Sequence, residues 1–179
     1  MMTREQFMSN LIPCLASDTP YAVGEWLDLK VYLRLVMGEC SGVVTPLNLE
    51  SAGIPTDEAL ECAKRNLGRQ LDIMPLDMIV GMFPPVEGGS NTVILTTKSR
   101  MFGAGTVLLD GLLDKVAQVM HTSDLYIIPS SVHEMLVTSH QMDELNDIIR
   151  SVNDEVVEER DVLTNHAYHF CNGKVEVVK

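Results

Sequence analysis

Hydrophobic and polar residues alternate along several short stretches of this chain, which predicts strands there. In the stretch 27–37, every second position from Leu29 to Leu35 is apolar and the positions between them are polar or aromatic. This alternation is typical of a half-buried strand. Further strands are expected at 92–97, 125–128 and 134–137. The end of the chain, 167–179, predicts a hairpin, because Asn172-Gly173 favours a tight two-residue turn.

In the first half, apolar residues three and four positions apart predict two helices. Thr3-Arg-Glu-Gln6 has the pattern of a capping box, so a helix is expected from there until Pro13 stops it. A second helix is expected to begin at Pro55, and Gly68 can close it. The predicted buried face of this helix consists of Ala59, Leu60, Ala63 and Leu67.

In the second half, two more helices are predicted. One covers 111–120 with Asp110 as its cap, and the stretch before it, 103–109, fits either a strand or the approach to that helix. The other follows a second capping-box pattern at 138–141 and runs to about Glu159. Its apolar positions are Met142, Leu145, Ile149, Val152 and Val156. Such a seam is expected to pack on the protein's own core, and a partner helix is the alternative.

These elements predict an α+β fold, with a mixed or mainly antiparallel sheet and helices packed on it. The stretch 84–92 is rich in proline and glycine and forms the clearest break in the pattern. We therefore expect two lobes that share a core. The N-terminal lobe would cover 1–83, the linker 84–92 and the C-terminal lobe 93–179.

The net charge of the chain argues against some classes of partner. Its 179 residues include 25 acidic and 13 basic side chains, a net charge of −12. A field of this sign repels phosphate backbones and anionic headgroups, so neither nucleic acid nor a membrane is an expected partner. No apolar run reaches the ~18 residues of a membrane span, the start does not resemble a signal peptide, and the four cysteines are scattered as in reduced proteins. We expect a cytoplasmic protein.

Two groups of residues suggest a metal or a cofactor at first sight. His166, His169 and Cys171 are zinc-binding residue types, but zinc needs three or four converging ligands. A strand would put only His169 and Cys171 on one face, and a helix only the two histidines. Gly103-Ala-Gly105 lacks the third glycine of a dinucleotide-binding fingerprint. The sequence therefore predicts no metal and no cofactor.

The stretch 124–139, DLYIIPSSVHEMLVTS, places β-forming residues on both sides of Pro129-Ser130-Ser131 and predicts a hairpin. Ser130, Ser131 and His133 are candidate binding residues at its turn, and Ser131 with His133 is the candidate pair for nucleophilic catalysis. On a strand, however, His133 and Glu134 would point to opposite faces, and no G-x-S-x-G elbow is present. The alternative is a turn whose hydroxyls satisfy backbone amides.

Lys98 and Arg100 lie between two predicted elements in a chain that has few bases. A basic turn on an acidic protein is a candidate site for an anion or a carboxylate. The alternative is a solvated hairpin tip, where charged residues commonly collect.

Several stretches, taken in order, resemble one uncharacterised bacterial family. YIIPSSVHE at 126–134 resembles the signature of domain-of-unknown-function family fifty-six eighty-eight. The other similar stretches are WLDLKVYLRLV at 26–36, GIPTDEALECAKRNL at 53–67, VILTTKSRMFGAGTVLLDGLLDKVAQ at 93–118 and ELNDIIRSVNDEVVEERDVLTNHAYHF at 144–170. Members usually carry a longer N-terminal region, so the resemblance implies that this chain corresponds to the family's C-terminal portion. It implies a shared fold and no particular activity.

Taken together, the sequence favours a non-enzymatic cytoplasmic module that binds another protein or assembles with itself. The apolar seam from Met142 to Val156 supports this reading, and the uncompensated acidity would complement a basic partner. The first alternative is a hydrolase-like enzyme that uses Ser131 and His133. The second is a sensor that holds an anion with Lys98 and Arg100.

Overall fold

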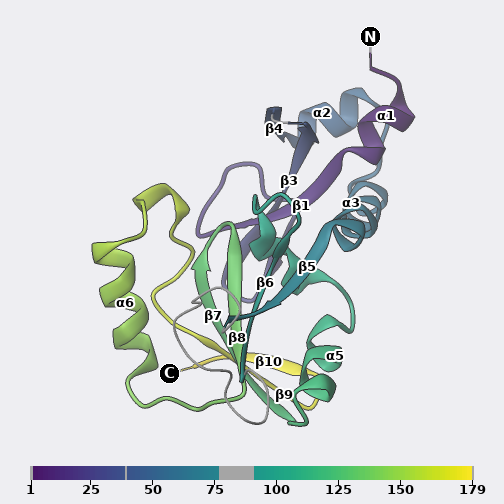
Figure 1. The fold of residues 1–179 in the computed structure, drawn as a ribbon. Helices are drawn as coiled ribbons and strands as arrows, with labels where there is room; N and C mark the ends of the chain where they lie inside the picture. Colours follow the sequence, from purple (N-terminus) through teal and green to yellow (C-terminus); the bar gives the residue numbers. More distant parts are fainter. Residues whose placement is uncertain (1, 39, 77–90, 179) are drawn as a thin grey trace. The chain divides into compact units, whose positions relative to one another are not determined.

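The computed structural model describes residues 2–38, 40–76 and 91–178. The chain divides into two compact units, Met1–Gln70 and Leu71–Lys179 (Figure 1). The predicted linker, 84–92, lies outside the described residues except for its last two positions, so that boundary remains a prediction. The predicted α+β class is confirmed, because each unit contains an antiparallel sheet together with helices.

The first unit is built around the long strand β3 (Leu29–Met37), which confirms the strand predicted there. β3 pairs antiparallel with three other strands: β1 (Leu11–Ala16), β2 (Gly24–Trp26) and β4 (Cys40–Val44). The predicted alternation is visible only in part in its burial. Leu29, Val31 and Leu33 are buried, but Tyr32 of the opposite face is also buried and Leu35 is half-buried.

Three helices accompany this sheet: α1 (Arg4–Ser9), α2 (Pro46–Ser51) and α3 (Thr56–Gln70). The predicted capping box of α1 is present, because the Gln6 amide donates to Thr3 Oγ1 at 3.1 Å and the Thr3 amide to Gln6 Oε1 at 3.0 Å. The α3 residues Ala59, Ala63 and Leu67 are buried, as predicted. Helices and sheet share a core of Leu11, Leu33, Val44, Leu49, Ile54, Ala59 and Ala63.

Two predicted helix ends in this unit are wrong. The first helix ends at Ser9, not at Pro13, because the chain from Leu11 onward pairs with β3 and places Pro13 opposite Leu33. Nearly every residue of β1 is buried, so its apolar run shows no strand period that could have marked the change. The second helix continues through Gly68 and ends at Gln70.

The second unit contains a six-stranded antiparallel sheet with the order β10-β9-β7-β8-β6-β5. The strands are β5 (Leu71–Pro75), β6 (Thr92–Thr97), β7 (Asp124–Ser131), β8 (Glu134–Thr138), β9 (Tyr168–Cys171) and β10 (Lys174–Val177). The strands predicted at 92–97, 125–128 and 134–137 are confirmed. In the closing hairpin, both Asn172 and Gly173 have positive φ, as a two-residue hairpin turn of the predicted type requires.

In the part of this unit that the structure describes, the helical segments are the 3₁₀ helices η1 (Gly103–Leu108) and η2 (Glu159–Asp161) and the α-helices α5 (Leu112–Val119) and α6 (Leu145–Glu155). One sheet face carries the fully buried Leu125, Ile127, Met135, Val137 and Tyr168. The residues between them point to the other face, where Tyr126 and Ile128 pack against α6. α6 lies along this side of the sheet (Figure 1).

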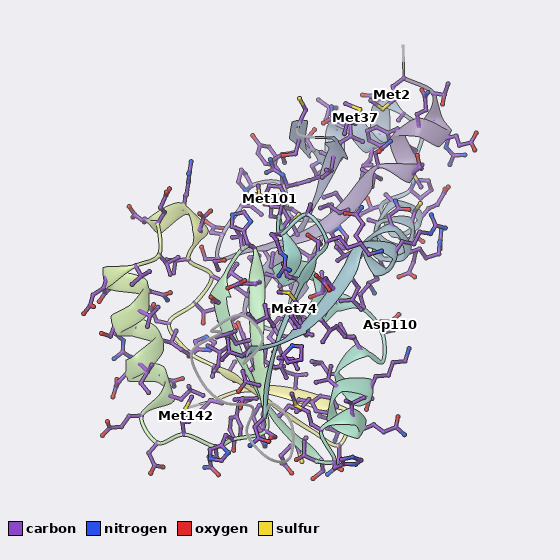
Figure 2. The ribbon with its side chains drawn as sticks, viewed as in Figure 1. Met2, Met37, Met74, Met101, Asp110 and Met142 are labelled. Carbon is purple, nitrogen blue, oxygen red and sulfur yellow. The ribbon has the colours of Figure 1, made fainter. Side chains whose placement is uncertain are left out.

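Both helices of this unit differ from their predicted starts. α5 is preceded by Gly111 in the left-handed conformation and has no side-chain cap, so Asp110 is not its cap. α6 begins at Leu145 and not at 138–141, because β8 extends through Thr138 and the Thr138 hydroxyl donates to the Asn91 carbonyl at 2.9 Å. Met142 therefore lies ahead of the helix (Figure 2). α6 also ends four residues before the predicted Glu159, at Glu155.

η1 settles the ambiguity at 103–109, since this stretch forms a 3₁₀ helix over 103–108. Its first residue, Gly103, packs so closely that an added Cβ would lie 2.4 Å from the His133 carbonyl oxygen and 2.5 Å from the Thr96 Cα. Only glycine fits between β6 and the turn that contains His133.

Candidate functional site

The predicted hairpin is present, but its turn is not at Pro129-Ser130-Ser131, because these residues belong to the first strand. β7 continues through Ser131 with an irregular register at Pro129–Ser131, and Val132 and His133 form the turn to β8. Ser130 donates to Glu134 Oε1 at 3.1 Å, and the Ser131 hydroxyl accepts from the His133 amide at 3.1 Å. These contacts agree with the alternative in which the hydroxyls stabilise a turn.

The His133 imidazole connects this turn to Phe102, which follows β6, and to Asp161 at the end of η2. Its Nδ1 accepts from the Phe102 amide at 3.1 Å, and its Nε2 lies 3.9 Å from Asp161 Oδ2. A ring nitrogen that accepts carries no proton, so the neutral ring has its proton on Nε2, on the side of Asp161. Ser131 and His133 are thus neighbours, but the ring and the hydroxyl are occupied by separate backbone amides. The hydrolase alternative gains no support from this geometry and stays a prediction.

Lys98 and Arg100 occupy the tight turn that follows β6. The Thr97 hydroxyl closes this turn by accepting from the Met101 amide at 3.2 Å and donating to the Met101 carbonyl at 2.9 Å. Arg100 has a left-handed backbone and lies 3.4 Å from Asp72 Oδ2 on β5. The carboxylate that Arg100 meets is thus part of the protein, and the binding of an external anion remains a prediction.

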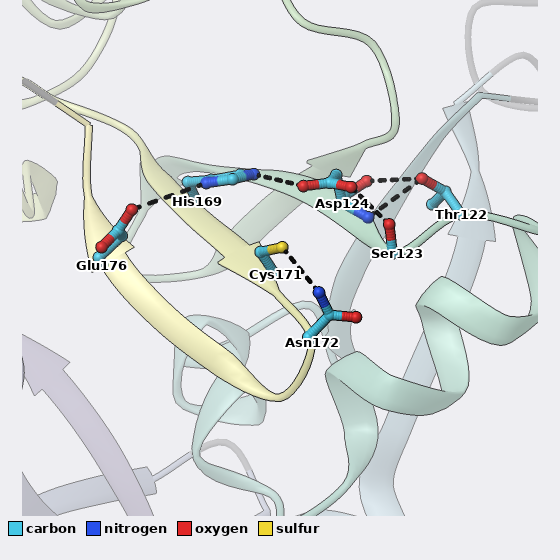
Figure 3. A network of polar contacts seen from close by, with 7 residues as sticks. All are labelled: Thr122, Ser123, Asp124, His169, Cys171, Asn172 and Glu176. Atoms are coloured by element: carbon cyan, nitrogen blue, oxygen red, sulfur yellow. Dashed lines mark hydrogen bonds and ion pairs between the residues drawn. The ribbon is translucent and has the colours of Figure 1, made fainter.

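Sequence reasoning missed a polar network at the ends of β7 and β9, which is centred on Asp124 (Figure 3). Asp124 Oδ1 lies 3.0 Å from His169 Nε2, and Asp124 Oδ2 accepts from the Ser123 hydroxyl at 2.5 Å. On the other side of the ring, Glu176 lies 3.9 Å from His169 Nδ1. The antiparallel register, which sets Asp124 opposite Cys171, brings the carboxylate and the thiol together.

The ionisation of this network follows from its hydrogen bonds. Those from Ser123 and Cys171 and the neighbouring His169 lower the pKa of Asp124 below its usual range. The same bond to Asp124, together with burial, raises the pKa of Cys171. A thiol that donates to a carboxylate is a poor nucleophile, because the thiolate is the reactive form. The network is therefore suited to fastening the β9–β10 hairpin to β7.

His166, His169 and Cys171 do not converge, as expected if this segment forms a strand. His169 and Cys171 share one face of β9, whereas the His166 ring lies edge-on to Tyr168 with ring centroids 5.0 Å apart. Across the described ranges 2–38, 40–76 and 91–178, no group of three or more histidine, cysteine, aspartate or glutamate side chains could hold a metal ion. A shallow pocket of about 460 Å³ between α5 and the 122–123 loop is lined by Lys115, Ser123 and Asn172 among others, and it is open to solvent.

A larger exposed feature lies on α6. Leu145 and Ile149 are buried with Ala167 in the core cluster on this side of the sheet. The predicted packing of the seam on the protein's own core is wrong for its other three members, because Met142, Val152 and Val156 are exposed. The next row of the helix, however, is apolar and exposed. We define the α6 flank as Ile148, Val152 and Val156, whose exposed fractions are 47%, 45% and 77%. These residues are four positions apart, so they lie one above another along one side of the helix and its C-cap.

The segment that carries the α6 flank is strongly acidic. Between 143 and 161 the chain has eight acidic and two basic side chains, a net charge of −6 and therefore half of the −12 of the whole chain. Both bases are already paired, Arg150 with Asp147 at 2.8 Å and Arg160 with Glu158 at 2.8 Å. The surface that results is an apolar row with a strongly negative border.

Two asparagines, Asn146 (half-buried) and Asn153 (buried), bond α6 to the segments 164–167 and Val178. Asn146 donates to the Val178 carbonyl at 3.1 Å and accepts from the Ala167 amide at 2.9 Å. Asn153 donates to the Thr164 carbonyl at 2.9 Å and to Asn165 Oδ1 at 2.8 Å. The α6 flank is therefore presented by a helix that is fixed at both ends.

The structure thus defines an α+β protein of two antiparallel-sheet units, with an exposed apolar row on one helix of the second unit. The chain belongs to the Family of unknown function (DUF5688), whose model matches residues 15–172. No curated protein and no solved structure matches the chain. Within the described residues, no helix has the length and apolar character needed to cross a membrane.

Proposed function

We propose that this protein is a non-enzymatic binding module that docks a partner protein on the α6 flank. The observation that carries the proposal is the exposure of Ile148, Val152 and Val156 in a single row. Isolated exposed apolar residues are normal on protein surfaces, whereas contiguous ones bordered by polar residues mark interaction sites. Covering such a row removes apolar area from water and favours association.

The surrounding charge favours a different protein over a second copy of this chain. Two copies that met through the α6 flank would bring two segments of net charge −6 together. Like charges at an interface oppose association, whereas a basic partner would gain from the same acids. The proposal also places the protein in the cytoplasm, which the free thiols of Cys14, Cys40, Cys62 and Cys171 support.

Photo-cross-linking tests this proposal. A photoreactive residue at position 151, which is exposed and one helical turn from Ile148, should form a discrete adduct in extract of cells that express the protein. The adduct should be lost from the double variant Ile148→Ser/Val152→Ser. Serine and these β-branched residues have similar helix propensity, so α6 itself should persist.

The matched control is Val119→Ser, which removes an equally apolar side chain that is 78% exposed on α5 in the same unit. Its adduct should equal that of the wild type. Equal yields from the double variant, or a monomer that forms no adduct at all, would contradict the proposal. Light scattering separates the remaining case, in which the adduct is a dimer of this chain.

A further inference from the structure

We infer that the partner segment bound by the α6 flank is a basic amphipathic helix. This inference rests on the proposed function, and it adds the secondary structure and the charge of the partner. Three features carry it: the hydrogen bonding of α6, the spacing of its exposed row and the charges at its border.

Between its two end turns, the backbone of α6 is hydrogen-bonded within the helix and offers no edge that could pair with a strand. From Leu145 to Glu155 its amides and carbonyls belong to a continuous helix, whose C-cap amide, that of Val156, donates to the Val152 carbonyl at 2.9 Å. A partner that binds the α6 flank therefore meets side chains only and must satisfy its own backbone hydrogen bonds. A helix meets this condition, whereas an extended peptide would leave its amides and carbonyls unpaired at the contact.

The exposed row has the length and spacing that helix packing uses. Ile148, Val152 and Val156 span about 12 Å along the axis at 1.5 Å per residue, which is a little over two turns. A row of residues four apart is one of the ridges that fit into the groove of another helix. α6 is also fixed to its own unit by Asn146 and Asn153, so binding does not have to order this helix and loses no conformational entropy there.

The acidic residues beside the α6 flank determine which charge the partner should carry. Glu144 and Glu155 are exposed beside the two ends of the row, and both basic side chains of the segment are already paired with Asp147 and Glu158. A helix with leucines on one face and lysines or arginines beside them would fill the row and neutralise these acids. An acidic helix with the same apolar face would meet repulsion instead.

Two designed peptides test the inference on the full-length protein. Both are amphipathic helices with the same leucine face, and they differ only in carrying lysines or glutamates on the polar face. Fluorescence anisotropy should show binding of the lysine peptide, with an affinity that falls as salt is raised, and no binding of the glutamate peptide.

A charge-removal variant, Glu144→Gln/Glu155→Gln, should weaken binding of the lysine peptide about tenfold at low salt. The control, Asp114→Asn/Glu176→Gln, removes acids on α5 and β10 and should leave the affinity unchanged. Ile148→Ser/Val152→Ser should abolish binding.

The possible results separate this inference from the proposed function. Equal binding of both peptides, lost in Ile148→Ser/Val152→Ser, would leave the docking surface in place and overturn the basic character of its partner. Failure of the lysine peptide to bind, or binding that survives Ile148→Ser/Val152→Ser, would overturn the inference while the cross-linking result still decides the proposed function. A salt-independent affinity would overturn the charge argument.

Discussion

The helices α5 and α6 of the second unit use their apolar residues differently. α5 buries Leu112, Leu113, Val116 and Ala117 and exposes only Val119 strongly, at its last position. α6 buries Leu145 and Ile149 but leaves a complete second row, the α6 flank, in solvent. The apolar face of α5 thus matches what the protein itself covers, whereas the apolar face of α6 is wider than its contact with the sheet. An amphipathic pattern therefore predicts a helix, and it does not predict how much of the apolar face the fold will bury.

The largest expected effect comes from the buried row of α6. Ile149→Ala removes a side chain that is 4% exposed in the cluster with Leu145 and Ala167. We expect a loss of about 2–5 kcal/mol in the free energy of unfolding, measured with urea, because the cavity cannot close completely. Leu113→Ala in α5 should cost a similar amount. A loss below about 1 kcal/mol for Ile149→Ala would mean that α6 is not packed as described.

A smaller effect is expected at the hydrogen bonds that hold α6. Asn153→Ala removes the donor to the Thr164 carbonyl and to Asn165 Oδ1 in a place that is 8% exposed. Leaving a buried acceptor unsatisfied should cost about 1–3 kcal/mol and speed amide exchange in α6. Ser151→Ala, on the exposed side of the same helix, serves as the control and should leave both quantities near the wild type.

The exposed row should matter little for stability. Ile148→Ser and Val152→Ser replace side chains that are nearly half exposed, so each should change the free energy of unfolding by about 0.5 kcal/mol or less. Val119→Ser in α5 should change the free energy of unfolding as little. Urea unfolding followed by circular dichroism measures these free energies. Losses as large as that of Ile149→Ala would show that the α6 flank is part of the core, and the contrast between the two helices would disappear.

The smallest effect is expected at Asp124, on the sheet face that α6 covers only in part. Its pKa is lowered in the folded protein, so its ionised form stabilises the fold above the unfolded pKa of about 3.9, and this contribution is lost as the pH falls through the folded value. Asp124→Asn should therefore be less stable than the wild type at pH 7, and the difference should shrink below about pH 4. A difference that stays constant with pH would contradict this account.

Much of the fold could be predicted because its signals are local. The strand predicted within 27–37, the capping box at Thr3 and the Asn172-Gly173 turn each depend on neighbouring residues, and each is confirmed. The wrong boundaries have tertiary causes. β1 is strand because β3 pairs with it, and Thr138 is strand because β8 pairs with β6. Long-range pairing of this kind leaves no mark in a capping pattern or a helical period.

The candidate site could be predicted from the sequence only in part, because it too depends on long-range packing. The pattern of α6 identified Val152 and Val156 as apolar positions, but it grouped them with Leu145 and Ile149 and missed Ile148. Which row faces the sheet depends on the rotation of the helix, which Asn146 and Asn153 fix through residues elsewhere in the chain. The Asp124 network depends likewise on the register of β7 with β9. The strand-face argument for His169 and Cys171 was correct, and the register of β7 was the missing information.

The yield of the cross-linked adduct from position 151 tests the role of the α6 flank most directly, when it is compared between Ile148→Ser/Val152→Ser and Val119→Ser. If the α6 flank docks a partner, the first variant should lose most of the adduct while the second keeps the wild-type amount. Equal adduct from both variants, with both proteins folded, would show that the exposed row of α6 does not bind the partner.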